Sequence, residues 1–136
     1  MALPKLATPT YELEIPSSKE KITYRPFLVK EEKLLLLAVE SEEDKEMLTA
    51  VNTIIQNCTF EKFDPKNLAL FDIEYIFLNI RAKSVGENIK LKLLCEDDGK
   101  TYADVEIDIE EVKIQYTDGH TNHISLNDDV SIIMKY

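Results

Sequence analysis

The chain has 136 residues, of which 44% are hydrophobic and 31% charged, and this is the composition of one globular domain rather than of a disordered protein. Its formal net charge of -10 is spread along the sequence and repels phosphate groups, which argues against nucleic acid as a direct partner. The sequence has neither the run of roughly 20 apolar residues that a membrane span needs nor a signal-peptide pattern. We therefore expect a protein without a membrane span that stays in a cytoplasm.

Residues 1–10 contain two prolines and no hydrophobic periodicity, which is typical of an extended arm that is free to dock. The folded part is therefore expected over residues 11–136, as a single α+β domain. It begins with alternating polar and apolar side chains over residues 11–15 and again over residues 21–25, with a break at residues 16–18. This period of two predicts a β-hairpin with one buried face.

Good helix formers follow over residues 28–40 and predict a first helix. Residues 41–44 resemble a capping box at the start of a second helix, whose apolar stripe comprises Met47, Leu48, Val51, Ile54 and Ile55. Asp64 and Pro65 have the pattern of an N-cap followed by a first-turn proline, and they predict the start of a third helix. This third helix is unusually apolar, which makes it the expected central helix, and it should end where Gly86 can adopt a left-handed conformation.

The last third of the chain is expected to form strands. Residues 88–94 and 102–107 alternate around a turn at Asp98 and Gly99, which predicts a second hairpin. Residues 112–116 should form a further strand that pairs, across a turn at Asp118 and Gly119, with a short strand over residues 123–126. The predicted fold class is α+β, with antiparallel hairpins packed on about three helices, one of them central and strongly apolar. The apolar ending without a polar tail predicts a domain that is cut short of a longer natural protein.

The ligand types of a zinc site are present in Cys58, Cys95, His120 and His123, but only the histidines are closely spaced and neither cysteine has a second thiol nearby. We therefore expect ordinary turn histidines, reduced cysteines and no metal. Acidic groups at residues 96–98, 104–108 and 127–129 do not match the spacing of a calcium loop. Alternate acids on a strand lie on its solvent face, so we expect solvated carboxylates rather than a catalytic pair.

No pattern of catalytic residues is apparent. The sequence contains no G-x-S-x-G nucleophile elbow, no G-x-x-x-x-G-K-[ST] phosphate loop and no G-x-G-x-x-G dinucleotide loop. We expect a protein that is not an enzyme, has no catalytic residues and binds no cofactor. The apolar residues of the third helix and of residues 34–37 have two interpretations, because they can belong to the core or form an exposed partner surface.

Two stretches are more specific than general periodicity. The first, residues 24–38, combines a strand end, a proline and a helix start in a fixed order, YRPFLVKEEKLLLLA, and the second, residues 80–87, is IRAKSVGE. Together with LPKL at residues 3–6 and PTY at residues 9–11, they resemble the baseplate hub protein family of T-even-like contractile-tailed bacteriophages, the family of gene product 26. The resemblance covers most of the chain, and family members continue into a further C-terminal region.

The resemblance implies a structural or assembly component of a contractile phage tail baseplate hub that acts by docking on other phage baseplate or tail proteins. The alternative is a transient assembly chaperone for a hub or tape-measure protein that is absent from the mature virion. Both place the protein in the host cytoplasm during assembly, and the first also places it in the virion tail baseplate. Neither implies enzymatic activity, and a small-molecule or metal-binding module is a third hypothesis that would need a deep polar pocket or bound metal.

The docking surface predicted from these stretches combines apolar side chains with a few cations. Its apolar members are Leu3, Leu6, Tyr11, Phe27 and Leu28. Its polar anchors are Arg25, Lys30 and Arg81. A free arm and exposed strands can add to a partner's sheet edge or lie in a groove, and the net acidity suits a basic partner face.

Overall fold

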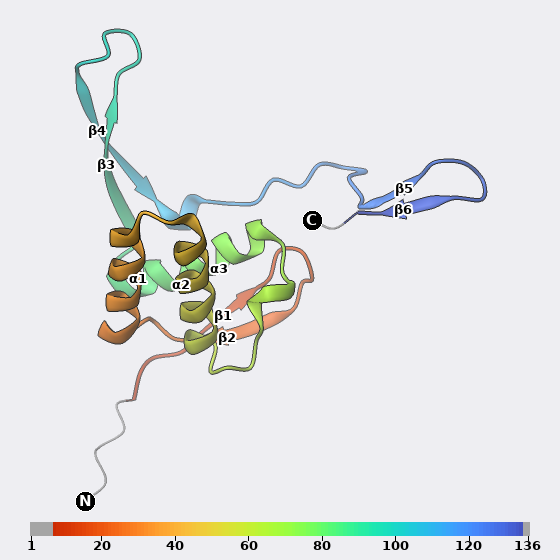
Figure 1. The fold of residues 1–136 in the computed structure, drawn as a ribbon, viewed down its shortest axis with the longest axis horizontal. Coiled ribbons are helices and arrows are strands. Elements are labelled where there is room, and N and C mark those ends of the chain that lie inside the picture. Colours follow the sequence, from red (N-terminus) through yellow and green to blue (C-terminus); the bar gives the residue numbers. More distant parts are fainter. Residues whose placement is uncertain (1–6, 135–136) are drawn as a thin grey trace, which may run out of the picture.

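The computed structural model describes residues 7–134, in which three α-helices and three antiparallel two-stranded sheets form an α+β fold, as predicted (Figure 1). The helices are α1 (Val29–Ser41), α2 (Asp44–Cys58) and α3 (Leu70–Val85). The hairpins are β1–β2 (Tyr11–Glu14 and Lys21–Tyr24), β3–β4 (Asn88–Leu94 and Tyr102–Asp108) and β5–β6 (His123–Ser125 and Ser131–Ile133). There are two short 3-10 turns: η1 (Pro65–Asn67) precedes α3, and η2 (Ile109–Glu111) follows β4.

The core forms where the β1–β2 hairpin packs on α2 and α3. The period-two pattern turns Ile22 and Tyr24 of β2 inward, and Ile15 follows β1 with no exposed surface. The buried cluster comprises Ile15, Ile22, Tyr24, Ile54, Ile55, Cys58, Ile73, Ile76 and Ile80. Since α2 and α3 each contribute three of these residues, the cluster does not single out α3 as the central helix, and that role stays a prediction.

We expect Ile76→Val to lower the free energy of unfolding by about 0.5–1.5 kcal/mol, because it removes one methylene from a fully buried side chain. Ile133→Val is the matched control, since Ile133 is 73% exposed and its substitution should change stability by about 0.5 kcal/mol or less. Urea denaturation of both variants measures the difference. Equal effects of the two substitutions would contradict this placement of the core.

The caps of the second and third helices differ from the sequence prediction. Helix α2 begins at Asp44, but no side chain caps it; the Ser41 hydroxyl instead donates to the Ala38 carbonyl at 2.8 Å. Asp64 does accept a hydrogen bond from the Lys66 N–H at 3.0 Å, but the turn that it caps is η1. Helix α3 begins only at Leu70, because the backbone returns to an extended conformation in between.

Helix α3 ends at Val85, as predicted, but Gly86 does not adopt the left-handed helical conformation. Its φ of 129° and ψ of 158° lie in a region that is nearly exclusive to glycine. The chain thereby turns directly into β3, and a side chain at this position would strain the backbone.

The β3–β4 hairpin is as predicted, and it projects away from the helices (Figure 1). Its base is fixed to the end of α3: the Ile109 N–H donates to the Glu87 carbonyl at 2.8 Å, and Lys83 Nζ lies 2.6 Å from Glu87 and 3.1 Å from Glu110. Its turn is closed by Asp98, whose pKa is lowered to about 2 by hydrogen bonds from the Thr101 hydroxyl and nearby backbone N–H groups. The direction of the hairpin is therefore set, while no element among residues 7–134 covers most of its length.

The predicted strand over residues 112–116 is wrong, and its predicted partner pairs elsewhere. Strand β5 pairs with β6, since the Asn127 side chain accepts hydrogen bonds from the N–H groups of Asp129 and Val130 and closes a tight turn between them. The segment that precedes β5 is held instead at the β1–β2 turn. There the Tyr116 hydroxyl donates to the Pro16 carbonyl at 3.0 Å, and Lys19 Nζ donates to the Tyr116 hydroxyl at 3.0 Å.

Candidate docking surface

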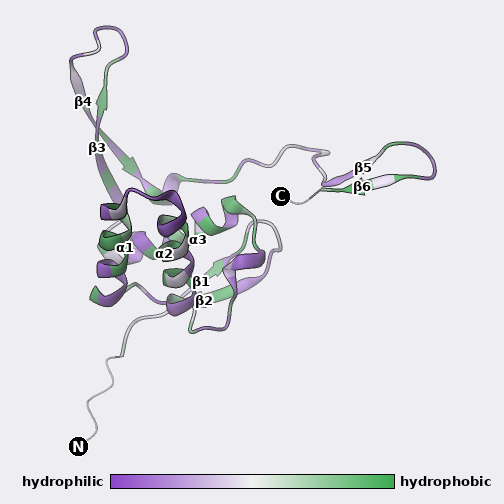
Figure 2. Cartoon of the chain, in the orientation of Figure 1, coloured by the Kyte–Doolittle hydropathy of each residue, from purple (hydrophilic) through white to green (hydrophobic). Residues whose placement is uncertain are grey.

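Among the described residues, half of the large apolar side chains that are exposed lie on or beside the two projecting hairpins. The strands of both hairpins carry apolar positions (Figure 2). The exposed apolar residues of β3–β4 include Leu91, Leu93, Leu94, Tyr102 and Ile107, and those around β5–β6 include Ile124, Leu126, Val130, Ile132, Ile133 and Met134. An isolated two-stranded hairpin is only marginally stable in water, and contiguous exposed apolar surface marks sites of protein contact. Both hairpins are therefore candidates for docking.

The register of β3–β4 separates its side chains onto two chemically different faces. One face carries aliphatic cross-strand pairs, such as Leu91 opposite Val105. The other carries complementary charges, with Lys90 opposite Glu106 and Lys92 opposite Asp104. The charged face places opposite signs across from each other on the two strands, whereas no element among residues 7–134 covers the aliphatic face.

The predicted docking residues differ in how much of each side chain is exposed. Leu3 and Leu6 lie outside the described residues. Leu28 and Lys30 are exposed at the start of α1. Tyr11 is half-buried in β1, where its ring centroid lies 5.7 Å from that of Tyr24.

Arg25 forms an internal ion pair. Its Nη2 lies 3.1 Å from Glu31 Oε1, and the two side chains are 14% and 3% exposed. The other Glu31 oxygen accepts the Leu28 N–H at 2.8 Å, so this carboxylate also caps the first turn of α1. Burial acts to raise the pKa of Glu31, but the hydrogen bonds from Arg25 and Leu28 outweigh it and hold the pKa below its ordinary value.

The two stretches that carry the family resemblance meet at Phe27 and Ser84. The Phe27 N–H donates to the Ser84 hydroxyl at 2.9 Å, and that hydroxyl donates to the Ile80 carbonyl at 2.5 Å. This contact ties the strand-to-helix junction to the end of α3. On the same helix, Arg81 is half-buried, and its Nη1 has no hydrogen-bond partner within the described structure.

The residues that could have supported chemistry are not gathered into a site. Cys58 is fully buried, and burial raises the pKa of its thiol to about 11, which keeps it protonated and unreactive near neutral pH. Between residues 7 and 134, no three His, Cys, Asp or Glu side chains converge as ligands for a metal ion. Over the same residues, no helix combines the length and apolarity needed to cross a bilayer.

The fold is that of a small α+β protein with exposed apolar hairpins. A family model described as "T4 bacteriophage base plate protein" matches residues 8–136, and the chain belongs to this family. It is thus a protein of the phage baseplate, a structural part of the tail. Searches of curated proteins and of solved structures give no match to this chain.

Proposed function

We propose that this baseplate protein is a component of the central hub of a contractile tail, and that it acts by docking on other baseplate or tail proteins without catalysing a reaction. The observation that carries the proposal is the pair of hairpins, β3–β4 and β5–β6, whose apolar side chains lack a cover within the described chain. In a baseplate protein, neighbouring tail proteins are the natural cover for such surfaces.

The start of α1 contributes a second part of this surface. We assign a part in docking, by direct contact or by shaping the surface, to Leu3, Leu6, Tyr11, Arg25, Phe27, Leu28, Lys30 and Arg81. Leu28 and Lys30 are exposed and available for direct contact. Arg25 and Phe27 act mainly by fixing the junction between β2 and α1, through the bonds to Glu31 and Ser84.

The test is quantitative mass spectrometry of purified virions beside assembly intermediates from the same infected cells. A permanent hub subunit is expected in both, at a constant ratio to the other baseplate proteins. Presence only in the intermediates would replace this proposal with the assembly chaperone, which docks in the host cytoplasm and leaves. Absence from both would contradict either role.

A further inference from the structure

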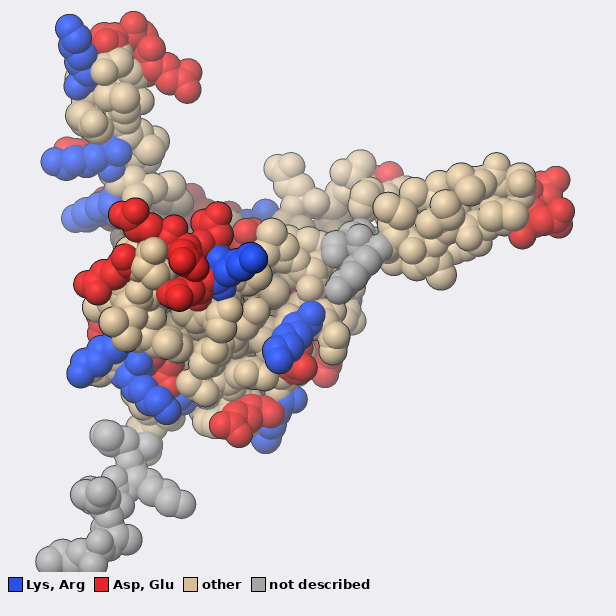
Figure 3. All heavy atoms as spheres, in the orientation of Figure 1, with Lys and Arg blue, Asp and Glu red and all other residues tan. Residues whose placement is uncertain are grey.

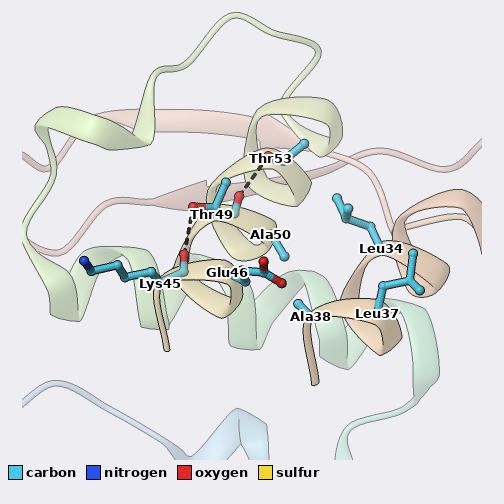
Figure 4. A pocket seen from close by; sticks show the side chains of 8 residues that line it. All are labelled: Leu34, Leu37, Ala38, Lys45, Glu46, Thr49, Ala50 and Thr53. Carbon is cyan, nitrogen blue, oxygen red and sulfur yellow. Dashed lines mark hydrogen bonds between the residues drawn. The ribbon is translucent and has the colours of Figure 1, made fainter. Parts of the chain in front are cut away.

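A groove of about 380 Å³ runs between α1 and α2 (Figure 4). Leu34 and Leu37 of α1 form one wall, and Leu37 is 64% exposed. Thr49 and Thr53 of α2 form the other wall. No element of the described structure fills the space between these walls.

Two alanines create the groove. Ala38 of α1 and Ala50 of α2 line it and are 6% and 4% exposed, so the two helices meet over small side chains there. The Thr49 and Thr53 hydroxyls donate to the carbonyls of Lys45 and Thr49, both at 2.8 Å (Figure 4). Because these hydroxyls are satisfied within α2, the threonines need no polar partner from an occupant, and the two walls are effectively apolar.

One end of the groove is strongly acidic. Residues 40–46, around the turn between α1 and α2, contain five exposed carboxylates against the single cation Lys45: Glu40, Glu42, Glu43, Asp44 and Glu46. Figure 3 shows red acidic side chains gathered over this turn. The Glu46 side chain lines the groove on the side of α1, whereas Lys45 extends in the opposite direction (Figure 4).

We infer that the groove between α1 and α2 binds an amphipathic helix of a partner protein, with an apolar stripe that fills the groove and Lys or Arg residues at the end beside residues 40–46. A helix fits because α1 and α2 are adjacent helices of 13 and 15 residues, and a third helix packs into the furrow between such a pair over about 20 Å. Cations fit because residues 40–46 carry five carboxylates against one cation, Lys45, which leaves this end with an excess of negative charge. The inference deepens the proposed docking function and rests on it.

A second copy of this chain is a poorer occupant. It would bring its own net charge of -10 against the same acidic rim, and like charges brought together at an interface disfavour binding. The last turns of the described helices also offer no free cation, since those of α1 and α2 contain none and that of α3 has only Lys83, which is paired with Glu87 and Glu110. The first turn of α1 has two lysines, but two glutamates accompany them.

The test uses three synthetic peptides of about 18 residues, roughly five helical turns each. The first has a Leu stripe at helical spacing and Lys residues in one terminal turn, the second replaces those Lys residues with Glu, and the third is a scrambled form of the first without the stripe. Methyl-detected NMR of the whole protein locates binding and gives the affinities. The first peptide should shift the methyl signals of the groove and bind roughly tenfold or more tightly than the other two.

Leu37→Gln should lower the affinity for the first peptide several-fold, because Leu37 lines the groove. Leu36→Gln should leave this affinity unchanged, because Leu36 is similarly exposed on α1 but does not line the groove. Equal binding of the scrambled peptide would mean attraction by charge alone and would overturn the inference. Shifts outside the groove, or concentration-dependent shifts of the groove methyls without peptide, would also overturn it. The virion measurement tests the hub function separately, so this inference can fail while that function stands.

Discussion

Arg25→Met should lower the free energy of unfolding at neutral pH by about 3–5 kcal/mol, the usual cost of removing one partner from a buried ion pair. Arg25 lies 3.1 Å from Glu31, which is only 2% exposed. Without the guanidinium, Glu31 keeps its hydrogen bond from the Leu28 N–H but has no cation beside it, and it becomes an uncompensated buried charge. Urea denaturation followed by circular dichroism measures the loss.

The pH dependence identifies Glu31 as the cause. In the native protein the pKa of Glu31 is lowered, so its contribution to stability is fully present above the unfolded pKa of about 4.3 and is lost as the pH falls through the lower folded value. In the Arg25→Met variant burial acts with little opposition, so Glu31 protonates more readily. The stability difference between the two proteins should therefore shrink between pH 7 and about pH 4.

Two controls separate the ion pair from general damage. Lys30→Met removes an exposed cation nearby and should cost about 0.5 kcal/mol or less. The double variant with Arg25→Met and Glu31→Leu should recover much of the loss, because it removes the buried charge together with its partner. If the free energy of unfolding of the single Arg25→Met variant lies within about 1 kcal/mol of that of the native protein, the ion pair is not stabilising.

Some segments were predictable from the sequence because their hydrophobic periodicity shows which of their sides is buried. The alternation in β1–β2 and the spacing of Ile54 and Ile55 on α2 reflect which side faces the core, and this information is local. Strand pairing is not local. Residues 112–116 have the alternation of a strand, but β5 finds a nearer partner in β6, and a period of two does not specify a partner.

The candidate surface was predictable only in part, for a related reason. Glu31 stands three residues after Leu28, which is the spacing of a capping glutamate, and this signal could have placed Glu31 at the first turn of α1. Its ion pair with Arg25 does not follow from that spacing. The groove had no such signal, because it depends on Ala38 and Ala50 meeting across two helices. The aliphatic face of β3–β4 was visible as alternation, but its lack of a cover is a property of the whole fold.

The combined substitution of Leu91→Thr and Leu93→Thr should strongly reduce incorporation of the protein into baseplate assemblies while leaving its fold intact. Both leucines lie on the aliphatic face of β3 and are 40% and 51% exposed. Threonine retains a preference for strands, so the hairpin should persist while its docking face becomes polar. If β3–β4 docks on a neighbouring tail protein, incorporation should fall roughly tenfold or more, as for contacts that dominate an interface.

Incorporation is measured by mass spectrometry of assemblies from cells in which the variant is the sole source of this protein. The matched control is Lys90→Thr with Lys92→Thr, which changes the opposite face of the same strand. Both variants should keep a thermal midpoint within about 4 °C of the native protein, because substitutions at exposed positions cost little stability. Normal incorporation of the leucine variant would show that this face has no partner in the baseplate, and equal loss in both variants would show that the contact is not made by the aliphatic face.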